Sequence, residues 1–191
     1  MIRRTTYALL LTLPGLAFAH AGSAAEHGLL AGLAHPFTGW DHLAAMLAVG
    51  FWTTLAARRG RLDLVLVPAA FVALLTTGAV ITAAGSAVPA VEPLIAASLL
   101  GLGLLVALQL HLPLAAALGL VGAFAFFHGA AHGQELAGGA ALAGMVLGTA
   151  ALHLMGMVAG FAARRRGPLW PRAAGAVLGL MGVSLLVGAL A

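Results

Sequence analysis

Histidine and carboxylate side chains are concentrated in two short stretches of an otherwise apolar chain. Residues 35–42 read His-Pro-Phe-Thr-Gly-Trp-Asp-His, and residues 128–135 read His-Gly-Ala-Ala-His-Gly-Gln-Glu. Imidazole and carboxylate ligands without thiolate suit nickel, cobalt, zinc or copper(II), and the set is too rich in nitrogen for magnesium or calcium. The two stretches therefore predict a shared metal site, with the candidate ligands His35, Asp41, His42, His128, His132 and Glu135.

The spacing within each stretch is compatible with ligands on one helical face. At about 100° per residue, His35 and His42 would lie about 20° apart on a single helix, with Met46 on the same stripe. Asp41 would either bind the metal from the flank or orient an imidazole through a hydrogen bond. In the second stretch His128, His132 and Glu135 follow i, i+4 and i+7, and share a face as far as the helix continues.

The composition indicates an integral membrane protein. Of the 191 residues, 62% are hydrophobic and 7% are charged, whereas a soluble domain is about half apolar and a quarter charged. Cysteine is absent, which excludes disulfides and thiolate zinc sites. All basic side chains except histidine are arginines in short segments between apolar runs. This distribution is typical of membrane topology and argues against nucleic-acid binding.

The chain is predicted to be an all-α integral membrane protein with a cleavable signal peptide followed by six transmembrane helices. Residues 1–19 combine two arginines, a short apolar run and a small-x-small end, Ala17-Phe18-Ala19, as in a secretory signal. The alternative is an uncleaved anchor helix. Residues 20–191 are expected to form one transmembrane domain. Its expected spans are residues 36–57, 64–84, 93–110, 113–132, 136–163 and 173–191.

The distribution of arginines gives an orientation in the membrane. If the mature chain starts outside and crosses six times, the segments 58–63, 110–113 and 164–172 lie inside. Every arginine of the mature chain falls in the first or last of these segments, as the positive-inside rule requires. Both mature termini then lie on the outer side. Both polar stretches lie at the outer side, because one begins the first span and the other ends the fourth.

Other histidines are weaker candidates for a role with metal. His153, inside the fifth expected span, is either a hydrogen-bonded structural group or a station on an ion path. His20 and His27 precede the first span and could capture metal outside, or could simply be solvated. His111 is expected to be a loop residue. Met46 completes the set of secondary candidates.

The two motifs resemble those of a known family. His-Pro-x-x-Gly-x-Asp-His at 35–42, followed by Phe-His-Gly-x-x-His-Gly-x-Glu at 127–135, is similar to the HupE/UreJ family. These are bacterial membrane proteins associated with hydrogenase and urease gene clusters and regarded as nickel, sometimes cobalt, permeases. The resemblance covers nearly the whole chain and implies ligand roles for the six residues selected above. Nickel rather than cobalt is implied by the family alone.

The function expected from these observations is secondary transport of Ni2+, or of Co2+, and not an enzymatic activity. No nucleotide-binding motif is present in the sequence, and no prosthetic group is expected. The alternatives are an intramembrane zinc hydrolase and a membrane metal donor for hydrogenase or urease maturation. The expected partners are the metal ion and the lipid bilayer. A second copy of the chain and nickel-enzyme maturation proteins are left open.

Overall fold

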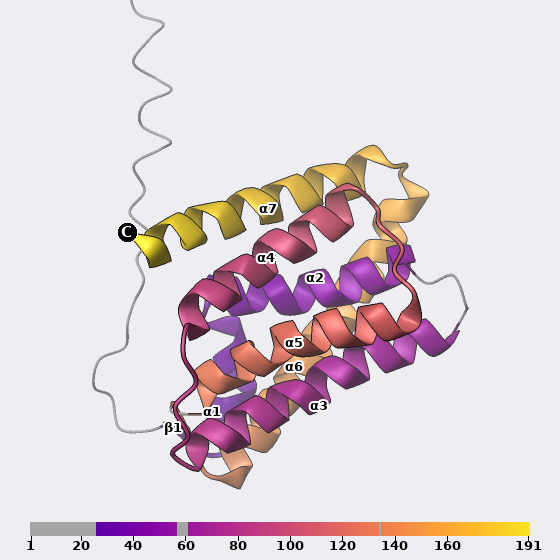
Figure 1. Ribbon diagram of the computed structural model, residues 1–191. Helices are drawn as coiled ribbons and strands as arrows, with labels where there is room; N and C mark the ends of the chain where they lie inside the picture. The colour runs from indigo at the N-terminus through magenta and orange to yellow at the C-terminus, as the bar shows by residue number, and fades with distance from the viewer. Residues whose placement is uncertain (1–25, 57–60, 134) are drawn as a thin grey trace, which may run out of the picture.

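Helices make up nearly all of the described chain, which a computed structural model covers for residues 26–56, 61–133 and 135–191 (Figure 1). The expected signal peptide and His20 lie outside these residues. The elements are β1 (Glu26–His27), α1 (Leu29–Ala34), the 3-10 helix η1 (His35–Phe37), α2 (Trp40–Ala56), α3 (Arg61–Ala83), α4 (Val91–Ala107), α5 (Leu114–His132), β2 (Leu136–Ala137), α6 (Gly139–Arg165) and α7 (Leu169–Leu190).

Each of the six expected apolar runs contains one long helix. Four helices are long and apolar enough to cross a membrane, namely α3 from Leu62 onward, α5, α6 and α7. Helix α4 is apolar but shorter. Helix α2 has 17 residues, which corresponds to about 25 Å at 1.5 Å per residue. The prediction of an all-helical membrane protein is therefore confirmed at this level, apart from the two short strands.

The first apolar run is not one continuous helix. Its start forms η1, and α2 begins only at Trp40. The Thr38 hydroxyl donates a hydrogen bond to the main-chain carbonyl of His35, at 2.7 Å, and the Thr38 main-chain N–H donates to the same carbonyl. This local turn closes the 3-10 helix and ends it. His35 and His42 therefore do not lie on one helical stripe, and tertiary packing has to bring them together.

The segment before η1 is attached to the segment that follows Glu135. Strand β1 pairs in parallel with β2, with Glu26 opposite Leu136 and His27 opposite Ala137. Helix α1 packs against the first half of α6, where Gly32 meets the main chain of Ala141 so closely that a Cβ would overlap its carbonyl. These contacts fix the position of His35 relative to the end of α5.

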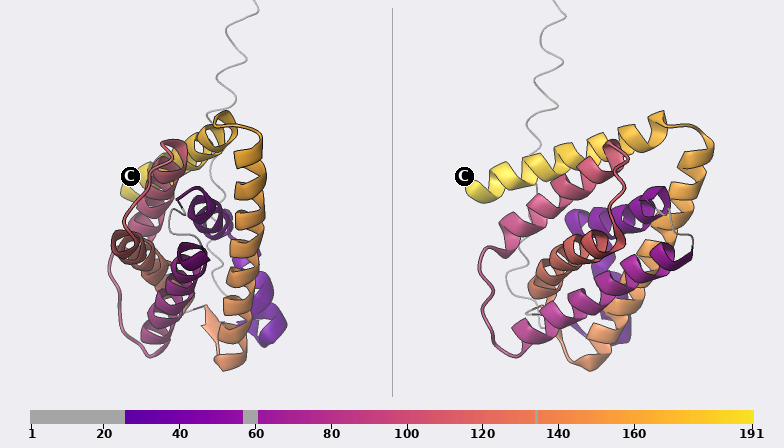
Figure 2. Two further views of the ribbon diagram at one scale, coloured as in Figure 1. Left: turned by 90° about the vertical axis from the view of Figure 1, so that its right-hand side faces the viewer. Right: turned by 45° about the vertical axis from the view of Figure 1, so that its right-hand side comes forward.

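The long helices pack mainly in three pairs: α2 with α6, α3 with α5, and α4 with α7 (Figure 1). Helix α2 also contacts α3 and α4, so that it has long helices on several sides (Figure 2). Glycines permit the closest approaches. A Cβ on Gly129 of α5 would overlap the Leu75 carbonyl of α3, and a Cβ on Gly50 of α2 would overlap the His153 carbonyl of α6.

Polar contacts tie the helices together at the end opposite His35. The Trp52 indole donates a hydrogen bond to the carbonyl of Leu110 at 3.0 Å. The Arg164 guanidinium donates to the carbonyl of Thr54 at 2.6 Å, which satisfies a main-chain acceptor near the end of α2. The C-terminal ends of α2 and α6 are thus held together, and an arginine lies at this end of the bundle.

Substitution of Gly129 tests how strongly the α3–α5 contact supports the fold. We expect Gly129→Ala to lower the free energy of unfolding by about 1–3 kcal/mol, the usual cost of overpacking, because the new methyl group meets the Leu75 carbonyl. Gly119→Ala is the matched control on the same helix, since nothing lies within 4 Å of its added Cβ. Thermal unfolding of the detergent-solubilised variants measures the difference. Equal melting temperatures would contradict the close packing.

Candidate metal centre

The residues predicted as ligands gather at one end of the bundle, although they come from three helices and the turn that follows α5. His35 is in η1, and Asp41 and His42 are in the first turn of α2. His128 and His132 occupy the last two turns of α5. Glu135 follows α5, just before β2. The predicted meeting of the two stretches is thus found in the structure, and their role as ligands stays a prediction.

The tightest group consists of His35, His132 and Glu135. His35 Nε2 lies 2.8 Å from His132 Nδ1 and 3.0 Å from Glu135 Oε2. His132 Nδ1 lies 3.4 Å from the same carboxylate oxygen. Each of these three described residues offers one ligand atom, and the three ligand atoms lie within 4.8 Å of one another. Imidazole–metal bonds of about 2.0–2.1 Å place ligand atoms across an ion about 4 Å apart, so an ion could be held with little rearrangement.

Glu135 reaches this group from outside the helix. Helix α5 ends at His132, and the Glu135 main-chain N–H donates to the His132 carbonyl at 3.1 Å. The turn folds the carboxylate back onto the two imidazoles. Hydrogen bonds from the His132 and His35 imidazoles hold the pKa of Glu135 well below its usual range, against the opposing effect of burial. The carboxylate is therefore charged where a cation would bind.

Asp41 orients the imidazole of His42. One carboxylate oxygen accepts hydrogen bonds from His42 Nδ1 at 2.8 Å and from the His42 main-chain N–H at 2.9 Å. A proton on Nδ1 leaves the lone pair on Nε2. Carboxylates beside metal-binding histidines usually fix the tautomer and the ring orientation in this way. Of the two roles that the sequence left open for Asp41, this geometry favours orientation of the imidazole.

His128 is oriented by the main chain. Its Nδ1 lies 2.8 Å from the carbonyl oxygen of Phe124. A carbonyl can only accept, so the proton is on Nδ1 and the lone pair is on Nε2. The sequence did not suggest Phe124, because a main-chain acceptor one turn earlier carries no residue-type signal.

The four imidazoles form a continuous cluster. The His132 ring centroid lies 4.6 Å from that of His35 and 4.2 Å from that of His42, and the His42 and His128 centroids are 5.1 Å apart. His128 and His132 are buried. The Nε2 atoms of His42, His128 and His132 are buried without a hydrogen-bond partner among the described residues. Because buried polar atoms are nearly always paired, these nitrogens are suited to a bound cation.

The secondary candidates lie elsewhere. Met46 is buried, and its sulfur accepts a hydrogen bond from the Thr149 hydroxyl at 3.3 Å. His153 is buried in α6 and is not part of the cluster of four imidazoles. The main chain of His27 is paired in β1, next to the segment that follows Glu135. His20 lies outside the described residues.

Comparison with known proteins identifies the family. The model of the HupE / UreJ protein family matches residues 8–185. The chain belongs to the HupE/UreJ family. It is 42% identical over 189 residues to Protein HupE of Rhizobium leguminosarum bv. viciae, a match that covers 96% of this chain and 97% of the relative. No solved structure matches the chain. The resemblance noted in the two motifs of this HupE/UreJ member is therefore confirmed.

Removal of the Asp41 charge tests whether this carboxylate supports a metal ligand. We expect Asp41→Asn to weaken binding of Co2+ or Ni2+ by about 10- to 100-fold, as is usual when a partner of a metal-binding histidine is lost, because His42 would lose its fixed tautomer. Calorimetric titration of the purified protein measures the affinity. His111→Ala, at an exposed histidine remote in sequence from both motifs, should leave it unchanged. An Asp41→Asn variant with wild-type affinity would show that the hydrogen bond does not serve metal binding.

Proposed function

We propose that this HupE/UreJ member is a secondary permease that captures Ni2+, or Co2+, at the outer end of the bundle and releases it to the cytoplasm. The observation that supports this best is the cluster of imidazoles at the end of an apolar bundle. In three of these imidazoles the Nε2 atom is buried and has no hydrogen-bond partner among the described residues. In a membrane such groups are costly and usually mark substrate or ion pathways.

We further propose that the bundle crosses the inner membrane six times. The four long apolar helices supply four crossings. Helices α2 and α4 would supply the other two, since each packs along a longer helix, α2 against α6 and α4 against α7. With the mature termini in the periplasm, the metal cluster faces outward. The arginines after α6 then face the cytoplasm, in accord with the positive-inside rule.

The membrane potential is a sufficient source of energy for such a permease. A divalent cation that moves inward gains about 2 × 2.3 kcal/mol per 100 mV. This corresponds to an accumulation of roughly a thousandfold, because about 1.4 kcal/mol is a factor of ten. Histidine and carboxylate ligands suit nickel and cobalt, and also zinc. Nickel is proposed on the strength of the motif resemblance.

A zinc hydrolase is the second candidate function, and one observation favours it. Two histidines and a glutamate, as in the His35–His132–Glu135 group, form a ligand set that catalytic zinc sites use. A hydrolase holds a single ion with an open position for water. The additional oriented imidazoles of His42 and His128 exceed what such a site requires, and they are better explained by a path along which an ion exchanges ligands. A metal donor for maturation proteins would bind metal without transporting it.

Nickel uptake by cells that produce the protein tests the permease directly. We expect His42→Ala and His132→Ala each to reduce uptake of radiolabelled nickel at least tenfold at equal membrane abundance, because each removes an imidazole from the cluster. His111→Ala is the control, and cobalt and zinc serve as competitors. Absence of uptake above the empty vector, with stoichiometric metal on the purified protein, would favour the hydrolase or the metal donor.

The proposed orientation can be tested by labelling, because the chain contains no cysteine. Ser86, in the loop after α3, and Arg166, at the end of α6, are both exposed. We expect a membrane-impermeant maleimide to label Ser86→Cys in intact spheroplasts, and Arg166→Cys only after permeabilisation. The reverse pattern would invert the topology, and labelling of both variants would contradict an odd number of crossings between these positions.

A further inference from the structure

His153 is a buried histidine that the outer cluster does not use. It lies in the middle of α6 with 2% of its surface exposed. Neither of its ring nitrogens has a hydrogen-bond partner among the described residues. A structural histidine inside a bundle would normally donate and accept at least one hydrogen bond. A buried imidazole with both nitrogens unpaired lowers the stability of the fold. A bound ligand would offset this loss.

The position of His153 is one step deeper than the cluster. Gly50 of α2 lies against the His153 main chain, and it follows His42 by eight residues, or about 12 Å along the helix. The Phe71 and His153 rings pack in a T-shaped arrangement with centroids 4.9 Å apart, and the Phe71 ring centroid is 6.0 Å from that of His128. In the proposed six-span arrangement, His153 would lie near the middle of a hydrocarbon layer of about 30 Å.

Further donor atoms lie between the two levels. Met46 follows His42 by one turn of α2, and Thr149 precedes His153 by one turn of α6. The thioether sulfur of Met46 and the hydroxyl of Thr149 are 3.3 Å apart and both side chains are buried. A cation that leaves the outer imidazoles would therefore meet a sulfur and an oxygen before the His153 ring.

We propose that His153 forms a second, inner binding position for the divalent cation, supplied from the outer cluster. This inference rests on the proposed permease function, and it assigns the inner half of the path. The position binds more weakly than the outer one, because the Glu135 carboxylate is absent from it.

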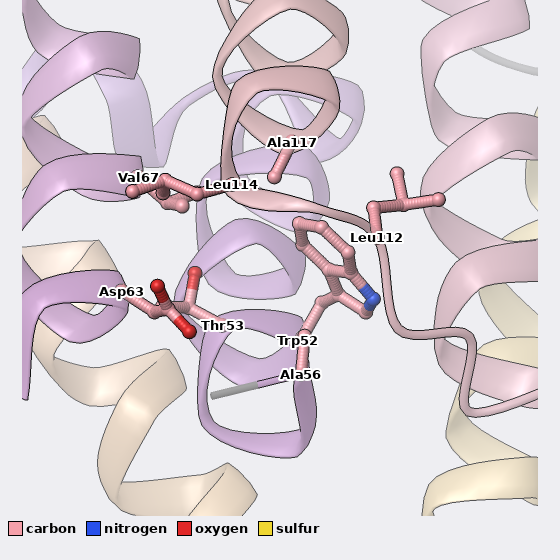
Figure 3. Close-up of a pocket in the computed structure, with 8 residues that line it drawn as sticks. All are labelled: Trp52, Thr53, Ala56, Asp63, Val67, Leu112, Leu114 and Ala117. Carbon is pink, nitrogen blue, oxygen red and sulfur yellow. The ribbon is translucent and has the colours of Figure 1, made fainter. Parts of the chain in front are cut away.

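Beyond His153 the proposed path continues to a small pocket at the arginine-rich end. Thr53 follows Gly50 by one turn of α2 and is buried. It lines a pocket of about 10 Å³ together with Asp63 and Trp52, among other residues. This is room for about one water molecule. Figure 3 shows the Asp63 carboxylate and the Thr53 hydroxyl on the same side of this pocket. A carboxylate here could accept the cation from His153 before release.

A single introduced thiol tests direct coordination, because the chain has no cysteine. In His153→Cys, bound Ni2+ is expected to give a thiolate-to-nickel charge-transfer band in the near ultraviolet. Leu152→Cys is the matched control, since Leu152 is equally buried but points about 100° away around the helix. A band of equal strength in both variants, or none in His153→Cys, would overturn the proposal.

A second variant covers the case in which the thiol disturbs folding. His153→Gln removes the imidazole and keeps a polar side chain of similar size. We expect wild-type protein to bind two Ni2+ ions at saturation, His153→Gln to bind one with unchanged outer affinity, and nickel uptake by the variant to fall at least tenfold. Equal stoichiometry and uptake in both proteins would overturn the inner position and leave the permease intact. Two bound ions without uptake by the wild-type protein would retain the inner position and refute the permease.

Discussion

The structure depends on the requirement that polar groups within an apolar bundle be paired. The fold meets this requirement for one ring nitrogen of His42 and of His128, and leaves the other nitrogen of each unpaired. Asp41 and the Phe124 carbonyl accept hydrogen bonds from the Nδ1–H groups of His42 and His128, and both imidazoles are thereby held as the tautomer with a lone pair on Nε2. The Nε2 atoms are left buried without a partner among the described residues. One half of each imidazole is thus fixed by the protein, and the other half is available for a cation.

Close helix packing is the second condition for this arrangement. In a bilayer there is little hydrophobic drive between helices, so small residues that let backbones approach are important. Gly129 lies between His128 and His132 and brings α5 against α3. Gly50 brings α2 against α6 at the level of His153. The glycines that permit the packing are therefore adjacent to the histidines that it positions, which couples the stability of the bundle to the geometry of the cluster.

Much of this could be predicted from the sequence, because hydropathy and charge act locally. The apolar runs located the long helices, and counting their crossings placed the two motifs at one end. The break at Thr38 and the turn that returns Glu135 could not be predicted, since each depends on local hydrogen bonds that compete with helix continuation. Helix α4 packs chiefly on α7 and α5 on α3, with a smaller contact between α4 and α5. Such partners are chosen by surface shape, which a pattern of apolar residues does not encode.

The hydrogen-bond contacts of the His132 imidazole help to distinguish the functions that the site could serve. Its Nδ1 atom lies within hydrogen-bond distance of His35 Nε2 and Glu135 Oε2, whereas its Nε2 atom has no partner among the described residues. An incoming cation at Nδ1 must replace these contacts, so part of its binding energy is offset and its affinity is moderated. Transport requires this balance, because an ion must bind well enough to enter and weakly enough to leave. A hydrolase gains nothing from such competition, since it retains its metal through every cycle. Ligand atoms that also contact one another are therefore better suited to the proposed permease than to a permanent metal centre.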